Sequence, residues 1–202
     1  MAPKPKRKVT NLLALAVLSY LVREPMHPYE LSRALRDNGD ARSVKFNHGS
    51  LYMVVGQLAK AGLITEAGTS RDGGRPERTV YELTDAGRTE LRNWMRDLIG
   101  HPEHEYPHFV AALSLIGVLP PDEVVELLGQ RRVRLDALKA EARAAIESAG
   151  EVHPLFLVEE EYRLALLDAE SRFIEGFVDR IVDPVDGWGP AWAAFHTERR
   201  RT

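Results

Sequence analysis

A glycine-rich turn between two short strand-like runs is the feature that most constrains the fold of this chain. Residues 71–76 read Arg-Asp-Gly-Gly-Arg-Pro, and the Asp-Gly and Gly-Gly pairs favour the tip of a β-hairpin. Residues 63–65 and 79–83 flank this turn, and the second run alternates apolar and polar side chains as a half-buried strand does. The other patterns are helical, so the predicted fold class is mainly α with a small β-hairpin.

Three short helices are predicted ahead of the hairpin. Dense apolar residues indicate a mostly buried helix over residues 9–22, which ends before Pro25 because proline disfavours helix in the residue that precedes it. Pro28 suits the first turn of a second helix. A third helix is predicted over residues 49–61, with Gly62 as its left-handed C-terminal cap.

A fourth helix is predicted after the hairpin, over residues 85–98, with Thr84 as its N-cap. Three short helices followed by a hairpin are the order of elements in a winged helix-turn-helix domain. In that fold the third helix enters the major groove of DNA, which is wide enough to accept a helix, and the hairpin reaches the adjacent backbone.

The second half of the chain is predicted to be helical and different in kind. A short helix over residues 108–118 is bounded by prolines, and two long helices follow it. Apolar residues recur there at alternating spacings of three and four over residues 124–149 and 155–181, which indicates a narrow coiled-coil-like seam on each helix. These seams can pack on each other, and they are also the usual means of forming a dimer.

Charge divides the chain at about the same place. Residues 1–100 carry 16 Lys and Arg against 11 Asp and Glu, and residues 101–202 carry 11 against 19. The basic half is expected to bind a polyanion such as DNA, and the acidic half is expected to repel one. We therefore predict a basic, disordered arm over residues 1–8, a DNA-binding domain over residues 9–100 and a helical dimerisation domain over residues 101–202. The arm can equally be a contact with DNA, a solubilising tail or, in a eukaryote, a nuclear signal.

Composition excludes several classes of protein. The 202 residues include no cysteine, which excludes a disulfide scaffold, thiol catalysis and a thiolate metal site. No apolar stretch approaches the ~20 residues that span a bilayer, so we expect a soluble, cytoplasmic protein. Phosphate-binding, dinucleotide-binding and serine-hydrolase motifs are missing, which disfavours an enzyme, and we expect no cofactor. His104 and His108 are four residues apart, but Pro107 interrupts the helix between them, so a metal site is disfavoured.

Three segments resemble the PadR family of transcriptional regulators. Residues 25–31 read Pro-Met-His-Pro-Tyr-Glu-Leu, close to the family's P-M-H-G-Y-E-L. Gly-Ser-Leu-Tyr at residues 49–52, with Leu58 and Ala-Gly-Leu-Ile at residues 61–64, resembles the family's recognition helix. Residues 74–78 and 81–88 resemble its wing and the start of its fourth helix. The resemblance implies a homodimeric, sequence-specific DNA-binding repressor that is released by a small effector.

Two departures from the family pattern bear on function. Pro28 replaces the family's glycine, and a helix tolerates proline at its first position. Gly56 and Gln57 stand where relatives are often basic, so the recognition helix carries little charge apart from Lys60. Either neutral groups read the operator, or affinity depends on the wing and the arm. The alternative function is a protein–protein adaptor that uses a winged-helix fold with little affinity for DNA.

The candidate DNA-binding residues lie on the recognition helix and the wing: Asn47, His48, Ser50, Tyr52, Gln57, Lys60, Arg71, Arg75 and Arg78. The hydroxyls of Ser50 and Tyr52 can contact phosphates, although Ser50 can also cap the helix and Tyr52 can pack. Trp94 on the fourth helix is either a stacking surface for a planar aromatic effector or a packing residue. The candidate dimer-interface residues are Leu128, Leu135, Leu138, Tyr162, Leu166, Phe173 and Phe177.

Overall fold

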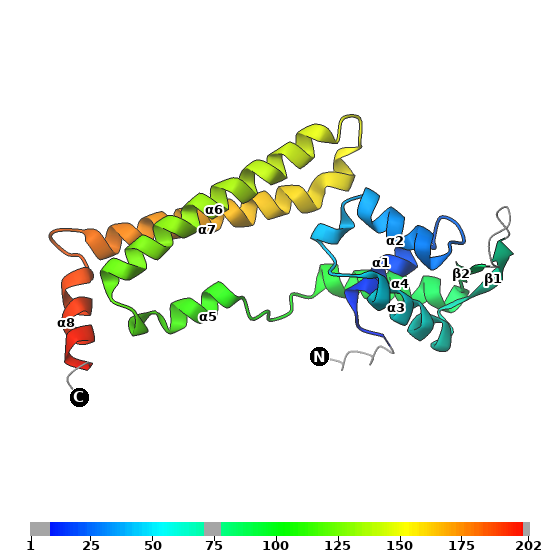
Figure 1. Cartoon of the computed structure of the whole chain (residues 1–202), viewed down its shortest axis with the longest axis horizontal. Coiled ribbons are helices and arrows are strands. Elements are labelled where there is room, and N and C mark those ends of the chain that lie inside the picture. The colour runs from blue at the N-terminus through cyan, green and yellow to red at the C-terminus, as the bar shows by residue number, and fades with distance from the viewer. Residues whose placement is uncertain (1–8, 71–77, 200–202) are drawn as a thin grey trace. The chain divides into compact units, whose positions relative to one another are not determined.

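The structure, a computed structural model, describes residues 9–70 and 78–199. It divides the chain into two compact units, Met1–His104 and Glu105–Thr202. Figure 1 shows short helices and the hairpin in the first unit and two long helices in the second. The mainly helical composition with one two-stranded sheet in the described part of the chain confirms the predicted fold class.

The N-terminal unit contains the helices and strands of a winged helix. Its helices are α1 (Leu12–Tyr20), α2 (Pro28–Asp37), α3 (His48–Lys60) and α4 (Asp85–Gly100), with a 3₁₀ turn η1 (Asp40–Arg42) between α2 and α3. Its strands are β1 (Ile64–Ser70) and β2 (Arg78–Leu83). Helix α1 packs against α3 and α4, and α2 packs against α3, so α3 is held from two sides.

Two element boundaries differ from the sequence predictions for physical reasons. Helix α1 is shorter than predicted, because the side-chain oxygen of Asn11 accepts a hydrogen bond of 2.9 Å from the Leu13 N–H and starts the helix there. Strand β1 is longer than predicted, because it pairs antiparallel with β2 from Ile64 opposite Leu83 to Ser70 opposite Arg78. Cross-strand pairing supplies hydrogen bonds that the sequence pattern of β1 alone does not reveal.

Close contacts join α3, the hairpin and α4. Gly62 has a φ of +74°, and the Leu63 N–H donates to the Leu58 carbonyl at 3.0 Å, which ends α3 as predicted. The Thr84 hydroxyl accepts a bond of 3.0 Å from the Gly87 N–H, which confirms it as the N-cap of α4. A Cβ on Gly87 would lie 2.0 Å from the Leu63 carbonyl oxygen, so this approach requires glycine.

A polar network fixes the connection between α2 and α3. The Tyr20 hydroxyl donates a short hydrogen bond to the Asp40 carboxylate and accepts one of 2.7 Å from the Asn38 amide. Burial, reinforced by the bond to Asp40, raises the pKa of Tyr20 to about 12. Met26 adds a second link, since it exchanges two backbone hydrogen bonds of 3.0 Å with Tyr81 of β2. The turn before α3 is therefore tied to α1, and the loop before α2 is tied to the hairpin.

The C-terminal unit is all helical in its described residues. Its elements are α5 (His108–Ser114), the 3₁₀ turn η2 (Ile116–Val118), α6 (Pro121–Ser148), the 3₁₀ turn η3 (Pro154–Leu157), α7 (Val158–Val182) and α8 (Gly189–Arg199). The predicted single helix over residues 108–118 is thus two short elements that meet at Leu115. Among the described residues, no helix combines the length and the apolar composition needed to cross a membrane.

Helices α6 and α7 lie side by side (Figure 1) and form an antiparallel hairpin. Ion pairs join them at three levels in the described residues: Arg131 with Glu170 at 2.5 Å, Arg132 with Glu175 at 2.9 Å and Lys139 with Asp168 at 3.7 Å. Further along, the Lys139 ammonium donates to the Ser171 hydroxyl at 3.1 Å. The small apolar core lies between the same helices and consists of Val124, Leu128, Leu135, Ile174, Phe177 and Ile181.

Aromatic side chains attach α5 and α8 to this hairpin. The Arg131 guanidinium lies 3.7 Å from the centre of the Phe109 ring, which holds α5 against α6. Trp192 of α8 is partly buried against the core, and Trp188 lies edge-on to Phe177 at 6.2 Å. Trp192 therefore holds α8 on the core, and Trp188 holds the segment that leads into it.

Candidate DNA-binding face

Helix α3 has one buried side and one exposed side. Leu51, Val54, Val55 and Leu58 are buried in the core of the N-terminal unit. The opposite side is exposed and includes four of the predicted DNA-binding residues, His48, Tyr52, Gln57 and Lys60. It also includes Gly49, Met53 and Gly56, which were not among the predicted contacts. The 3.6-residue helical period produces this division, because residues four apart lie on the same side.

The N-terminus of α3 is held by a capping box. The Asn47 side-chain oxygen accepts a bond of 2.8 Å from the Ser50 N–H, and the Ser50 hydroxyl oxygen accepts one of 2.8 Å from the Asn47 N–H. The Ser50 hydroxyl also donates to the Asn47 carbonyl at 2.9 Å. Asn47 is therefore the N-cap and Ser50 completes the box. Both side chains position the helix start. The Ser50 hydroxyl both donates and accepts in this box, whereas the box uses only the side-chain oxygen of Asn47 and not its amide nitrogen.

Tyr52 lies in an aromatic cluster at the start of α3. Its ring lies 4.7 Å from the His48 ring and 6.3 Å from the His27 ring. His27 is the N-cap of α2, where its Nδ1 accepts a bond of 3.0 Å from the Tyr29 N–H. Because Nδ1 accepts, the proton of the neutral ring is on Nε2. His27 was not among the residues predicted from the sequence. Glu30, three residues later, forms the other half of its capping box and is the signal that indicates a helix start there.

Lys60 provides the only charge on α3. The helix contains no other lysine or arginine and no carboxylate. Lys60 lies in the last turn, where a cation also interacts favourably with the helix dipole. The exposed side of α3 therefore consists mainly of neutral side chains.

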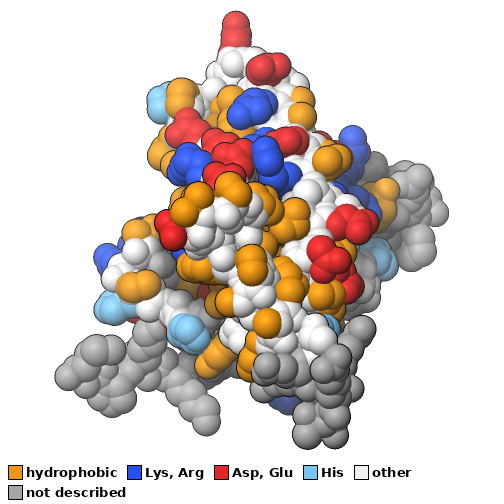
Figure 2. All heavy atoms as spheres, turned by 90° about the vertical axis from the view of Figure 1, so that its left-hand side faces the viewer, with side chains coloured by type: hydrophobic (Ala, Val, Ile, Leu, Met, Phe, Trp, Pro, Cys, Tyr) orange, Lys and Arg blue, Asp and Glu red, His pale blue; other side chains and the backbone are white. Residues whose placement is uncertain are grey.

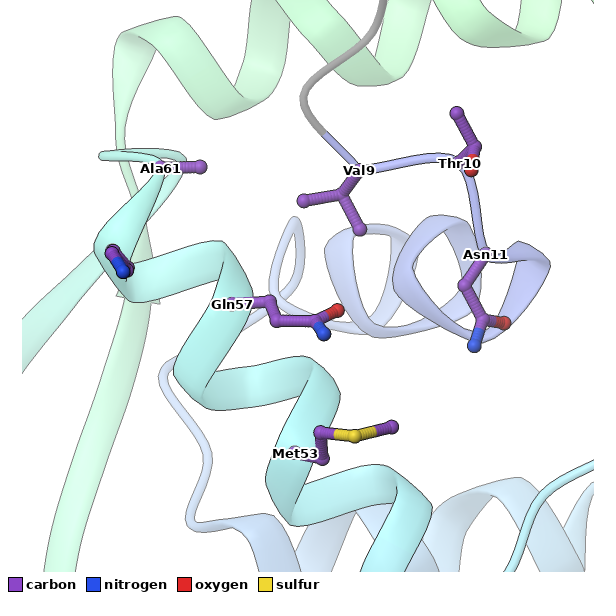
Figure 3. A pocket seen from close by; sticks show the side chains of 7 residues that line it. Val9, Thr10, Asn11, Met53, Gln57 and Ala61 are labelled. Atoms are coloured by element: carbon purple, nitrogen blue, oxygen red, sulfur yellow. The ribbon is translucent and has the colours of Figure 1, made fainter.

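A pocket of about 590 Å³ opens beside this face (Figure 3). It is lined by Val9, Thr10 and Asn11 from the segment before α1 and by Met53, Gln57, Lys60 and Ala61 of α3 and its cap. Figure 3 shows Met53 and Gln57 pointing from α3 towards the side of residues 9–11. The chain that leads into α1 therefore borders the exposed side of α3.

The wing residues lie mostly outside the described part of the chain. Arg71, Arg75 and the rest of the predicted tip at residues 71–76 lie outside the described residues. The described strands end at Ser70 on one side of the tip and begin at Arg78 on the other. Arg78 begins β2, and its side chain is also outside the description. The predicted basic arm over residues 1–8 also lies outside the described residues.

Comparison with known proteins places this unit in a family. The profile of the PadR-like family of transcriptional regulators matches residues 17–93, which include α2, α3, both strands and most of α4. The N-terminal unit is a PadR-like domain. This match confirms the family that the motifs around residues 25–31, 49–64 and 74–88 resemble. PadR-like proteins are transcriptional regulators, not enzymes.

Individual relatives cover more of the chain than the family profile does. The negative transcriptional regulator PadR of Bacillus subtilis is 28% identical over 147 residues, which are 69% of this chain and 78% of that protein. The crystal structure of B. subtilis PadR in complex with operator DNA matches with a TM-score of 0.65 at 21% identity, over 83% of this chain and 98% of the other. The complex of that protein with p-coumaric acid matches with a TM-score of 0.60 at 19% identity, over 82% of this chain and 99% of the other.

Trp94 of the PadR-like unit is a core residue. It is 4% exposed and belongs to the same apolar cluster as Leu13, Leu31 and Leu58. This arrangement agrees with the packing interpretation of Trp94. It leaves no open ring face on which a planar effector could stack without a rearrangement of the core.

The predicted dimer residues fall into two groups. Leu128, Leu135 and Phe177 are buried between α6 and α7 of the same chain, so a second chain cannot cover them further. Leu138, Tyr162, Leu166 and Phe173 are exposed at 46%, 66%, 53% and 44%. The apolar row predicted along α7 thus leaves the intrachain core over most of its length.

Metal ligands do not converge in the described residues. No group of three or more His, Asp or Glu there could hold a metal ion. His108 begins α5 directly after Pro107, and His104 lies in the segment before it, outside any helix. The two residues therefore do not share a helix face.

Proposed function

We propose that this chain is a PadR-type repressor that binds operator DNA as a homodimer, with α3 as its recognition helix and the β1–β2 hairpin as its wing. The exposed, capped face of α3 carries this proposal, because the described winged-helix unit leaves one side of its third helix free for a partner. B. subtilis PadR, whose fold is similar, has been solved with operator DNA. The net positive charge of residues 1–100 favours the same partner.

The C-terminal unit supports the homodimer part of the proposal. Tyr162, Leu166 and Phe173 form an apolar row along α7 that the chain itself leaves exposed. Figure 2 shows one face of the molecule, on which hydrophobic side chains lie among charged ones. A row of large apolar side chains on a long helix is typical of a two-fold interface, in which the same surface pairs with itself. Two half-sites one helical turn apart would then be bound together.

Release by a small aromatic effector completes the proposal. The complex of B. subtilis PadR with p-coumaric acid shows that a relative of the same fold binds such a compound. A ligand releases an operator only if it binds the DNA-free state more tightly than the DNA-bound state. Because Trp94 is buried, we assign this residue to the core and leave ligand stacking to other surfaces.

The test is DNA binding by the purified full chain over a range of salt concentrations. Duplexes selected from a random pool should bind tightly, and log K should fall linearly with log salt because phosphate contacts release counterions. Sedimentation of the same sample should give a dimer at micromolar concentration, and p-coumaric acid is the first compound to add to the complex. If no duplex binds above the level of a neutral control protein, the adaptor interpretation replaces this proposal.

A further inference from the structure

The exposed side of α3 has an unusual set of groups for a surface that reads DNA. Two rows of residues four apart run along it: His48, Tyr52, Gly56 and Lys60, and Gly49, Met53 and Gln57. Neither row contains arginine, which with lysine is the common partner of guanine in the major groove. Lys60, the one cation of the two rows, has a long, flexible side chain that suits a phosphate better than a base edge. The groups that remain for base contacts are an amide, a thioether and aromatic rings.

Gln57 is the residue on this side best suited to identify a base. Within the described part of the chain, its amide has no hydrogen-bond partner, so both its oxygen and its nitrogen are available. An amide can accept from the N6 amino group of adenine and donate to N7 at the same time, a pair of bonds that guanine cannot complete. Figure 3 shows the Gln57 amide standing clear of α3 at the pocket bordered by residues 9–11.

Met53 lies one turn before Gln57 and presents an apolar surface. Its side chain is 57% exposed, although methionine is usually buried in a core. The thymine C5-methyl group is the apolar feature of the major groove, and apolar side chains contact it. Adenine and thymine are paired, so Gln57 and Met53 can recognise the two strands of neighbouring A·T pairs.

Gly56 lies beside Met53 in the neighbouring row, three residues further along α3, and has no structural reason to be glycine. A Cβ at this position would meet nothing within 4 Å, whereas a Cβ at Gly87 would meet backbone at 2.0 Å. Glycine is also unfavourable in a helix interior, so the fold alone would be served better by alanine. The missing side chain leaves room for another molecule to approach the backbone of α3.

We propose that α3 reads A·T base pairs, with Gln57 hydrogen-bonding an adenine and a thymine methyl group resting on Met53 above Gly56. This inference rests on the proposed function and specifies the class of operator. Lys60 contacts a phosphate in this arrangement. Tyr52, held between His48 and His27, borders the same surface.

The first experiment is selection of bound duplexes from random DNA by the full-length wild type and by Gln57→Arg. Wild-type sequences should carry A·T pairs at the centre of each half-site, and Gln57→Arg should exchange one of these for G·C. The discrimination at that position should change by about 5- to 150-fold, the value of one bidentate contact. Gln130→Arg on α6 adds the same charge elsewhere on the chain and should leave the preference unchanged.

The second experiment separates DNA contact from folding. Gly56→Ala should raise the Tm and yet weaken binding to the selected duplex several-fold, because the new methyl group occupies the space above the backbone. Gly129→Ala is the matched control, since Gly129 is also an exposed helical glycine with nothing within 4 Å of a Cβ. It should raise the Tm without any effect on binding.

The outcomes distinguish this inference from the proposed function. Tight, salt-dependent binding to G·C-rich sites, or an unchanged preference in Gln57→Arg, overturns the A·T assignment and leaves the repressor proposal intact. Unchanged or tighter binding by Gly56→Ala overturns the role of Gly56. A wild type that binds no duplex at all overturns both proposals together.

Discussion

The two units of this chain differ in how completely they bury their large apolar side chains. In the N-terminal unit, Leu13, Leu18, Leu31, Leu35, Leu51 and Leu58 are fully buried around one core. In the C-terminal unit the buried core is smaller, and Val133, Tyr162, Leu166 and Phe173 are among the side chains left exposed. Burial of apolar surface is the main stabilising contribution to folding. The first unit therefore has the contacts to be stable alone, and the second gains most from a partner.

Charge follows the same division. The half that contains the winged helix is net positive, and the half that contains the long helices is net negative. The acidic side chains of α6 and α7 are partly used within the hairpin, where Glu170 and Glu175 pair with arginines of α6. In the proposed repressor, this separation keeps the acidic side chains of α6 and α7 on a different unit from the face of α3 that is proposed to meet the phosphate backbone.

The largest expected effect tests the dependence of the C-terminal unit on a partner. Leu166→Asp combined with Phe173→Asp places two charges on the exposed row of α7 and should give a monomer by sedimentation. Operator affinity should then fall by about 10²-fold or more, since the two half-sites are no longer bound together. Val185→Asp, at an exposed position after α7, is the control and should remain dimeric. A double variant that stays dimeric places the interface elsewhere.

The second prediction tests the completeness of the N-terminal core. Trp94→Ala should lower the free energy of unfolding by about 3–5 kcal/mol, because it removes a large buried side chain. The measurement is urea unfolding followed by far-UV circular dichroism, with Trp94→Phe as a milder variant that keeps an aromatic ring. If Trp94→Ala keeps wild-type stability but fails to dimerise, Trp94 belongs to an interface and the contrast between the units weakens.

The third prediction concerns the network that fixes the turn before α3. Tyr20→Phe should cost about 1 kcal/mol near neutral pH, where it removes the hydrogen bond to Asp40. The pKa of Tyr20 is raised to about 12 in the folded protein, so its contribution is complete below pH 10 and is lost as the pH rises towards 12. The stability difference between wild type and Tyr20→Phe should therefore shrink over this range. A constant difference up to pH 12 contradicts this account.

The smallest effect concerns the wing. Arg75→Ala or Arg78→Ala should weaken binding to all duplexes to a similar degree and reduce the slope of log K against log salt by about one, if each arginine holds one phosphate. Fluorescence anisotropy with labelled duplexes at several salt concentrations measures this slope. An unchanged slope with an altered sequence preference would instead mean that the arginine reads a base or the width of a groove.

Local patterns in the sequence determined much of the N-terminal unit. Three predicted helix ends agree with the structure: α2 starts at Pro28, Thr84 caps α4, and Gly62 ends α3. Sequence predicts them because capping and turn preferences depend on residues close in sequence. The family motifs likewise depend on short segments, and they identified the PadR-like domain. The division of α3 into a buried side and an exposed side has a similarly local cause, since it follows the helical period.

Tertiary structure decided which side chains remain available for partners. The apolar pattern of α7 was consistent with packing against α6 or against a second chain, and the fold buries Phe177 while leaving Leu166 exposed. Asn47 and Ser50 were candidate DNA contacts, and the three-dimensional structure uses both in a capping box. Gly56 became informative only when the space around it was known. A sequence specifies which residues are apolar or polar, but the distances between distant segments determine which of them are already satisfied within the chain.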